Sequence, residues 1–196
     1  MTASRLRIIL WALVGLAAVG GILLALQPRT PVTRQTELGT IGGPFTLTGS
    51  DGKPFSSAKL DGRPAAIFFG FTNCPDVCPT TLARLVKLRK ELGKGDEALS
   101  IVFISVDPDR DGPAEVGSYA SLFNAPVIGL TGSSADIERV KKQFAVYSAK
   151  VPQPGGGYSV DHSAAVFLMD RDGKFVATLS PEEGDKVALD KLRRIS

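Results

Sequence analysis

The chain has 196 residues, 43% of them hydrophobic and 22% charged, which is enough to bury one hydrophobic core. Its 23 lysine and arginine residues include Arg5 and Arg7; without these two, 21 basic residues face 20 acidic ones. This near balance argues against a nucleic-acid-binding surface. The only histidine, His162, excludes any site that needs two imidazoles.

The first predicted element is a membrane-spanning helix over residues 8–26, where every residue is apolar or glycine. At about 1.5 Å per residue this helix spans about 28 Å, close to the hydrocarbon thickness of a bilayer. Arg5 and Arg7 precede it without a compensating acid, so residues 1–7 are expected in the cytoplasm. The chain is therefore expected to cross the membrane once.

A cleaved signal peptide is the alternative for this segment. The apolar stretch is longer than the usual core of a signal peptide, and Leu24–Leu26 lacks the small-x-small pattern of a cleavage site. We therefore expect an uncleaved anchor in a bacterial inner membrane. Prolines and glycines in residues 27–43 predict a linker between this anchor and the soluble domain, residues 44–196. With residues 1–7 in the cytoplasm, that domain is expected in the periplasm.

The first half of this domain contains a hairpin, two strands and a helix. Alternation over residues 45–48, followed by Asp51-Gly52, predicts a short hairpin. Residues 65–71 are all small or apolar and have the length of a buried strand. Leucines recur at helical spacing over residues 82–92, and residues 99–106 predict a second central strand. A strand, a helix and a strand in this order indicate a parallel pair.

The second half begins with a helix whose first residue is Pro113. Apolar residues at helical spacing predict another helix over residues 137–144. Residues 164–169 and 174–179 flank an Asp-Gly turn and predict a hairpin, and residues 189–195 predict a closing helix. The order β-α-β and then β-β-α predicts an α/β, thioredoxin-like fold with an N-terminal β-hairpin extension and an inserted helix and strand.

The only two cysteines, Cys74 and Cys78, lie between the first buried strand and the leucine-striped helix. Backbone N–H groups and the dipole at a helix start stabilise thiolates, so both sulfurs are candidate nucleophiles or metal ligands. A structural disulfide is one alternative, but a loop of about five residues gains only about 2 kcal/mol from closure. Two unpaired buried cysteines are another, which the polar, proline-rich surroundings disfavour.

The spacing of the cysteines separates the possible chemistries. Three residues lie between them, whereas the thioredoxin redox motif has two. A structural zinc site usually has four protein ligands, and blue copper needs two histidines. Two thiolates and one imidazole suit three-coordinate, soft Cu(I), so Cys74, Cys78 and His162 are the candidate metal ligands.

His162 is expected in the loop that enters the strand at residues 164–169, which lies beside the cysteine turn in a thioredoxin-like sheet. No proline stands at this entry, where a thioredoxin has its cis-proline, which argues against a general disulfide exchanger. Asp161 is a candidate for orienting the imidazole, and Asp107 and Tyr158 are candidates for supporting contacts near the ligands. Turn and cap chemistry is the alternative explanation for both aspartates.

Three segments together resemble the Sco/SenC family of copper chaperones. They are Gly70–Pro79, Ile104–Asp111 and Tyr158–Ser163, in that order. The resemblance implies copper, as Cu(I), Cu(II) or both, at Cys74, Cys78 and His162. It also implies a role in assembling the CuA site of cytochrome c oxidase subunit II, with that subunit as partner and another periplasmic copper chaperone or a thiol reductant as a further one.

Two other activities remain open at the cysteine pair. In a thiol-disulfide oxidoreductase, Cys74 and Cys78 cycle between dithiol and disulfide and reduce the cysteines of the oxidase subunit. In a peroxiredoxin a cysteine also stands at this turn. Its motif has threonine three residues before the cysteine, however, whereas Thr72 lies two before Cys74.

Overall fold

A computed structural model describes residue 11 and residues 41–195, and the latter belong to one structural unit. Within these described residues, no helix has the length and apolar character needed to cross a bilayer. The predicted membrane helix at residues 8–26, apart from Trp11, and most of the predicted linker lie outside the described residues.

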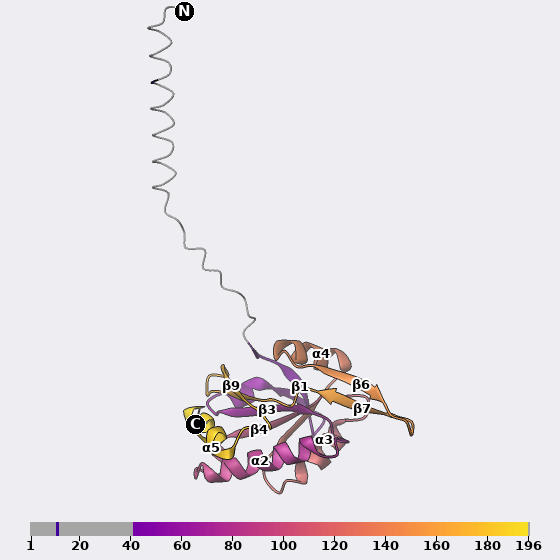
Figure 1. The fold of residues 1–196 in the computed structure, drawn as a ribbon, viewed down its shortest axis with the longest axis horizontal. Coiled ribbons are helices and arrows are strands. Elements are labelled where there is room, and N and C mark those ends of the chain that lie inside the picture. The colour runs from indigo at the N-terminus through magenta and orange to yellow at the C-terminus, as the bar shows by residue number, and fades with distance from the viewer. Residues whose placement is uncertain (1–10, 12–40, 196) are drawn as a thin grey trace, which may run out of the picture. The chain divides into compact units, whose positions relative to one another are not determined.

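A seven-stranded mixed sheet forms the centre of the domain (Figure 1). Strands β3, β4 and β5 are parallel, and each of the others runs antiparallel to its neighbours. In spatial order the strands are β2 (Pro54–Ser56), β1 (Thr46–Gly49), β5 (Ile128–Thr131), β4 (Ser100–Ser105), β3 (Ala65–Gly70), β8 (Val166–Met169) and β9 (Phe175–Leu179).

Helices cover both faces of this sheet (Figure 1). Helices α2 (Val77–Glu91), α3 (Pro113–Ser121) and α5 (Asp185–Ile195) pack on one face. Helix α4 (Ser134–Gln143) packs on the other, and short 3-10 turns η1 (Ser57–Leu60) and η2 (Asp96–Ala98) precede β3 and β4. The layers follow from the sequences of the central strands β3, β4 and β8, in which every residue is buried.

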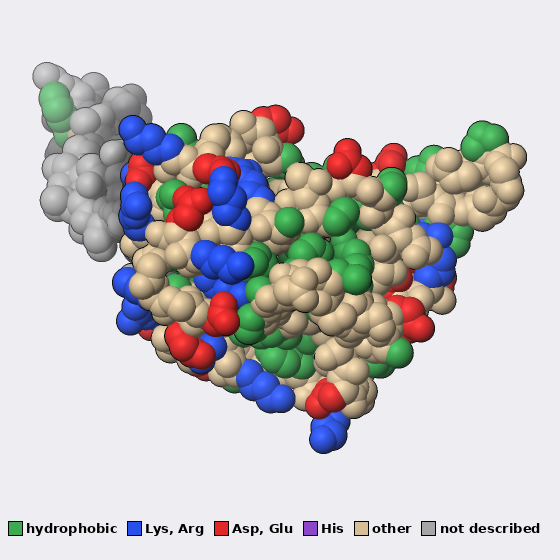
Figure 2. All heavy atoms as spheres, turned by 90° about the horizontal axis from the view of Figure 1, so that it is seen from below, with side chains coloured by type: hydrophobic (Ala, Val, Ile, Leu, Met, Phe, Trp, Pro, Cys, Tyr) green, Lys and Arg blue, Asp and Glu red, His purple; other side chains and the backbone are tan. Residues whose placement is uncertain are grey.

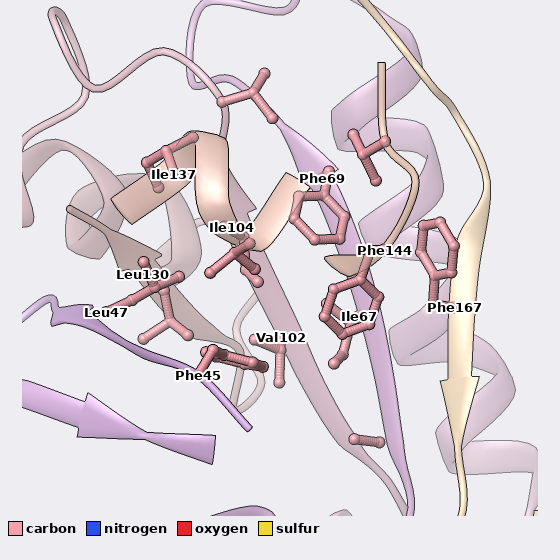
Figure 3. Packing of buried hydrophobic residues seen from close by; sticks show 14 of the residues in the cluster. Phe45, Leu47, Ile67, Phe69, Val102, Ile104, Leu130, Ile137, Phe144 and Phe167 are labelled. Atoms are coloured by element: carbon pink, nitrogen blue, oxygen red, sulfur yellow. The ribbon is translucent and has the colours of Figure 1, made fainter. Parts of the chain in front are cut away.

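Strand β3 shows how the sequence divides the core into two clusters. All six of its residues are buried, and successive side chains point to opposite faces. Ile67 and Phe69 join the cluster under α4, whereas Ala66 and Phe68 join the cluster under α2, α3 and α5. In the first cluster, Phe69 and Phe167 pack against Phe144, with ring centroids 5.3 and 5.4 Å away (Figure 3).

The predicted order of elements is confirmed, including the leading hairpin β1–β2 and the inserted helix and strand, α3 and β5. One hairpin was missed. Strands β6 (Ser148–Pro152) and β7 (Tyr158–His162) form a separate two-stranded sheet. Its lysine, prolines and glycine-rich turn interrupt the alternation of apolar and polar residues that is typical of strands. The sequence therefore predicts a loop where β7 lies. His162 is the last residue of that strand.

Figure 2 shows how the charged side chains are arranged on one face of the molecule. Lysine and arginine side chains lie among aspartate and glutamate side chains, and a hydrophobic area occupies the middle of the view. The two signs of charge are therefore mixed on this face, as the near balance of the composition predicts.

The aromatic cluster yields a test of the core. Replacing Phe144 by Ala removes the ring that Phe45, Phe69 and Phe167 contact, and we expect the free energy of unfolding to fall by about 3–5 kcal/mol. Chemical denaturation measures this loss. Leu122→Ala is the control, because Leu122 is 69% exposed and its replacement is expected to cost less than about 0.5 kcal/mol. Equal losses in the two variants would contradict the packing described.

Candidate metal centre

The cysteine loop leads from the end of β3 into the first turn of α2. Cys74 lies in the loop, half-buried, and Cys78 is the second residue of the helix and is buried. The Cys74 N–H donates to the carbonyl oxygen of Phe71 at 3.2 Å, which closes the loop. The Cys78 N–H then donates to Cys74 Sγ at 3.4 Å. An N–H at a helix start thus points at a sulfur, as the sequence predicts.

Three possible ligand atoms meet at this point. The Sγ atoms of Cys74 and Cys78 and a ring nitrogen of His162 all lie within 4.8 Å of one another. The Cys78 Sγ and His162 Nε2 atoms are 3.5 Å apart, although 84 residues separate them in the chain. The structure therefore brings together the three residues predicted as ligands, and both thiols are free.

The His162 ring is held by two aromatic rings and one carbonyl. Phe68 and Phe71 contact it edge to face, with centroids 6.0 and 5.9 Å away. Its Nδ1 atom lies 2.9 Å from the carbonyl oxygen of Ser163. A carbonyl oxygen can only accept, so Nδ1 carries the proton in this contact. Nε2 then keeps its lone pair on the side of the sulfurs, ready for a metal.

Asp161 was predicted as the partner of this imidazole. Neighbouring residues of a strand point to opposite faces, and Asp161 is exposed while Val160 is buried. The carbonyl oxygen of Ser163, rather than the expected carboxylate of Asp161, therefore contacts His162 Nδ1.

Gly70, the last residue of β3, leaves room for the sulfur of Cys78. A Cβ atom at this position would lie 2.7 Å from Cys78 Sγ, closer than real Cβ atoms come, and 3.0 Å from the Phe103 ring, which is a tight contact. Burial raises the pKa of the Cys78 thiol far above its ordinary value, and the neighbouring Cys74 and Asp111 raise it further. The metal-free Cys78 is therefore a thiol at neutral pH, and the expectation of a stabilised thiolate at both cysteines is wrong for Cys78, because burial outweighs the helix start.

Asp111 anchors the base of the cysteine loop. Its buried carboxylate accepts hydrogen bonds from the Thr72 N–H at 2.8 Å, the Thr72 hydroxyl at 2.6 Å and the Ser105 hydroxyl at 2.6 Å. Its carbonyl accepts from the Thr131 hydroxyl at 2.6 Å. Asp111 was not among the predicted site residues, because an aspartate just before a helix is usually read as turn or cap chemistry.

Asp107 and Tyr158, the other two predicted supporting residues, contact each other. The Tyr158 hydroxyl donates to Asp107 Oδ1 at 2.8 Å, and Asp107 is buried. Arg110 donates to the second oxygen of Asp107 and, at 2.9 Å, to the carbonyl of Tyr158. The structure thus joins the end of β4 to the hairpin that ends in His162.

The donor set limits the chemistry of the centre. Two thiolates and one imidazole favour soft, thiophilic ions, and three ligands leave a position open for an incoming group. The same two sulfurs lie within 4.8 Å of each other, so oxidation can join them in a disulfide if they move closer. The site can thus hold a metal ion, store two electrons, or do each in turn.

Comparisons with known proteins agree with this geometry. The SCO1/SenC family model matches residues 33–196. The chain is 36% identical to the protein SCO2 homolog, mitochondrial, of Bos taurus. The alignment is 202 residues long and covers 97% of this chain and 75% of the relative.

Solved structures give the same result for the fold. ScoI of Bradyrhizobium japonicum, solved with copper bound, is 43% identical with a TM-score of 0.71, over 80% of this chain and 99% of that one. BsSco, a member of the Sco family of cytochrome c oxidase assembly proteins in which a disulfide switch was identified, is 27% identical with a TM-score of 0.60, over 80% and 93%. The thioredoxin-like α/β fold predicted from the sequence is confirmed.

Gly70→Ala tests whether the space at the end of β3 sets the position of a ligand. The added methyl group is expected to displace Cys78 Sγ and to lower Cu(I) affinity by about tenfold or more, as misplaced groups around a metal do. Competition with a chromophoric Cu(I) chelator measures the change. Gly155→Ala is the matched control, since a Cβ there meets nothing within 4 Å. Unchanged affinity in folded Gly70→Ala protein would refute this role.

The two cysteines are also expected to differ in reactivity. In single-cysteine variants of the metal-free chain, Cys74 is expected to react with iodoacetamide much faster than Cys78, because Cys78 is buried and its raised pKa leaves little thiolate. The reaction rate of Cys78 should keep rising with pH above about 8.5, the ordinary cysteine pKa, because its own pKa is higher. Mass spectrometry follows both rates. Equal rates at neutral pH would contradict the burial of Cys78.

Proposed function

The chain belongs to the SCO1/SenC family, and we propose that it binds copper at Cys74, Cys78 and His162 and takes part in assembling cytochrome c oxidase. The observation that carries this proposal is the meeting of two sulfurs and one imidazole nitrogen within 4.8 Å. The copper-bound structure of the Bradyrhizobium relative supports the choice of metal. The described residues contain this one Cys/His group, and its donors match the preference of Cu(I) for thiolate and imidazole.

Copper is the cargo of this site, and the unequal burial of the ligands suggests how it leaves. Cys74 is half-buried at the surface, whereas Cys78 is buried beneath it. A thiolate of an acceptor protein approaches the ion on the exposed side and takes the open coordination position. Cys74 then dissociates first, and the ion passes to the acceptor while Cys78 and His162 still hold it. Ligand exchange of this kind never releases free copper.

We further propose that the acceptor is the CuA site of cytochrome c oxidase subunit II and that the copper donor is another periplasmic chaperone. The predicted helix at residues 8–26 would hold the domain at the outer face of the bacterial inner membrane. This assignment rests on the family and on the sequence of the N-terminal segment.

Thiol-disulfide exchange is the second candidate function, favoured by the two adjacent free thiols and by the disulfide switch identified in the relative BsSco. Cys74, the less buried of the two cysteines, attacks a disulfide of the oxidase subunit and forms a mixed disulfide. Cys78 then attacks Cys74, the subunit leaves as a dithiol, and this chain is left with an internal disulfide. Cys78→Ser is expected to trap the mixed disulfide if this reaction occurs.

Anaerobic titration with Cu(I) tests the main proposal. The reduced full chain is expected to bind one copper ion per molecule. Cys74→Ser and Cys78→Ser should each abolish tight binding, because a single thiolate and an imidazole hold Cu(I) weakly. His162→Ala should keep both sulfurs and weaken binding by about 10–100-fold.

Asp161→Asn is the matched control, since its side chain lies next to His162 on the opposite face of β7. Its Cu(I) affinity is expected to equal that of the wild-type chain. The proposal fails if the wild-type chain takes up no copper or if His162→Ala binds it as tightly as the wild type. Weaker binding by Asp161→Asn would instead restore the carboxylate as the partner of the imidazole.

A further inference from the structure

The hairpin β6–β7 carries one copper ligand but belongs to no larger sheet. Its two strands pair only with each other, from Ser148 with His162 to Pro152 with Tyr158, and not with the seven-stranded sheet. In Figure 1 it extends from one end of the domain. Short segments join it to α4 and β8, and side-chain contacts supply the remaining constraint on its position and on the distance from His162 to the cysteines.

Arg110 makes the most extensive of these contacts. Its Nη1 atom donates to the carbonyl oxygen of Tyr158 at 2.9 Å, and its guanidinium carbon lies 3.8 Å from the centre of the Tyr158 ring. Its Nε atom donates to Asp107, whose other oxygen accepts from the Tyr158 hydroxyl at 2.8 Å. One arginine thus holds both the backbone and the ring of a single hairpin residue.

The periodicity of β7 connects this contact to the metal site. Tyr158, Val160 and His162 lie on the same face of the strand, because side chains alternate. Val160 is buried in the core between them. Phe71 completes the link from the other side: its ring centre lies 5.9 Å from the Arg110 guanidinium carbon and 5.9 Å from the His162 ring.

Arginine suits this position for a reason that lysine does not share. Its planar guanidinium presents donors in several fixed directions and can stack on an aromatic ring at the same time. Lys150 also lies over the Tyr158 ring, at 4.6 Å, but it is exposed and pairs with Asp109. It makes no hydrogen bond to the Tyr158 backbone, whereas Arg110 does.

We propose that Arg110 is a positioning residue for the copper site: it fixes the hairpin through Tyr158 so that His162 Nε2 faces the two sulfurs. The inference rests on the copper site proposed above. Arg110 touches neither the metal nor its ligands by hydrogen bonds, and it acts through Tyr158 and Phe71. Without it the cysteines keep their places, because Asp111 holds their loop independently.

The test compares wild-type full chain with Arg110→Met, His162→Ala and the double variant, all reduced and loaded with Cu(I). X-ray absorption is expected to find two sulfurs and one nitrogen on copper in the wild type, and two sulfurs without the imidazole in Arg110→Met. Cu(I) affinity should fall by about 10–100-fold in Arg110→Met. The double variant should bind as His162→Ala does, since both changes remove the same ligand.

Arg110→Met leaves the buried Asp107 without its cation and can fail to fold for that reason. The variant Asp107→Asn/Arg110→Met removes both charges and provides a second form of the same test. Arg84→Met is the matched control. Arg84 also bonds a carboxylate and a backbone carbonyl, its side chain is 19% exposed against 28% for Arg110, and it joins α2 to α5.

Amide hydrogen exchange in the metal-free chain separates this inference from the copper proposal. Arg110→Met, or the charge-free pair, is expected to speed exchange at the β7 amides by about tenfold or more, whereas Arg84→Met leaves them unchanged. If the wild type binds no copper, the copper proposal fails, and unchanged β7 exchange would remove the role of Arg110 as well. Copper bound with its nitrogen and full affinity in Arg110→Met would overturn the inference alone.

Discussion

The arrangement of the site depends on the hydrogen bonds that the buried carboxylate of Asp111 accepts. A carboxylate removed from water is costly unless donors surround it, and Asp111 receives three, from Thr72 and Ser105. Thr72 begins the cysteine loop and Ser105 ends β4, so one side chain ties the ends of two parallel strands together. The cysteine loop therefore starts from a fixed point, and Gly70 leaves the space into which Cys78 then fits.

The ligands differ in how they are held. The two sulfurs lie on a loop and a helix start that are anchored in the main sheet, whereas the imidazole comes from a hairpin that the sheet does not include. Residues 105–111 connect the two parts, because Ser105 and Asp111 hold the loop and Asp107 and Arg110 hold the hairpin. The proposed centre thus has two ligands anchored in the main sheet and one on a separate hairpin, and the half-buried Cys74 is the sulfur nearer to solvent.

The order of the elements and the meeting of Cys74, Cys78 and His162 could be predicted from the sequence, because each has a strong local signal. The buried strands are continuous apolar runs, and the chain contains only two cysteines and one histidine. The hairpin β6–β7 could not be predicted in the same way, because Lys150, Pro152 and the three glycines at 155–157 interrupt the alternation expected of strands. The hairpin is stabilised instead by contacts with residues distant in the chain. The contacts of Asp111 and Arg110 could not be predicted from the sequence for a related reason. Their partners, Thr72 and Tyr158, are 39 and 48 residues away, and only the folded chain shows that a turn-like Asp-rich segment supports a metal site.

We infer that Cys74, Cys78 and His162 bind one copper ion together in a framework that is already formed. Anomalous diffraction at the copper edge, from crystals of the Cu(I)-loaded reduced chain, would locate that ion. We expect a single strong peak bonded to both Sγ atoms and to His162 Nε2, with the hydrogen bonds from Thr72 to Asp111 and from Arg110 to Tyr158 still in place. A copper peak away from these three atoms, or one bonded to the sulfurs while His162 points elsewhere, would contradict it.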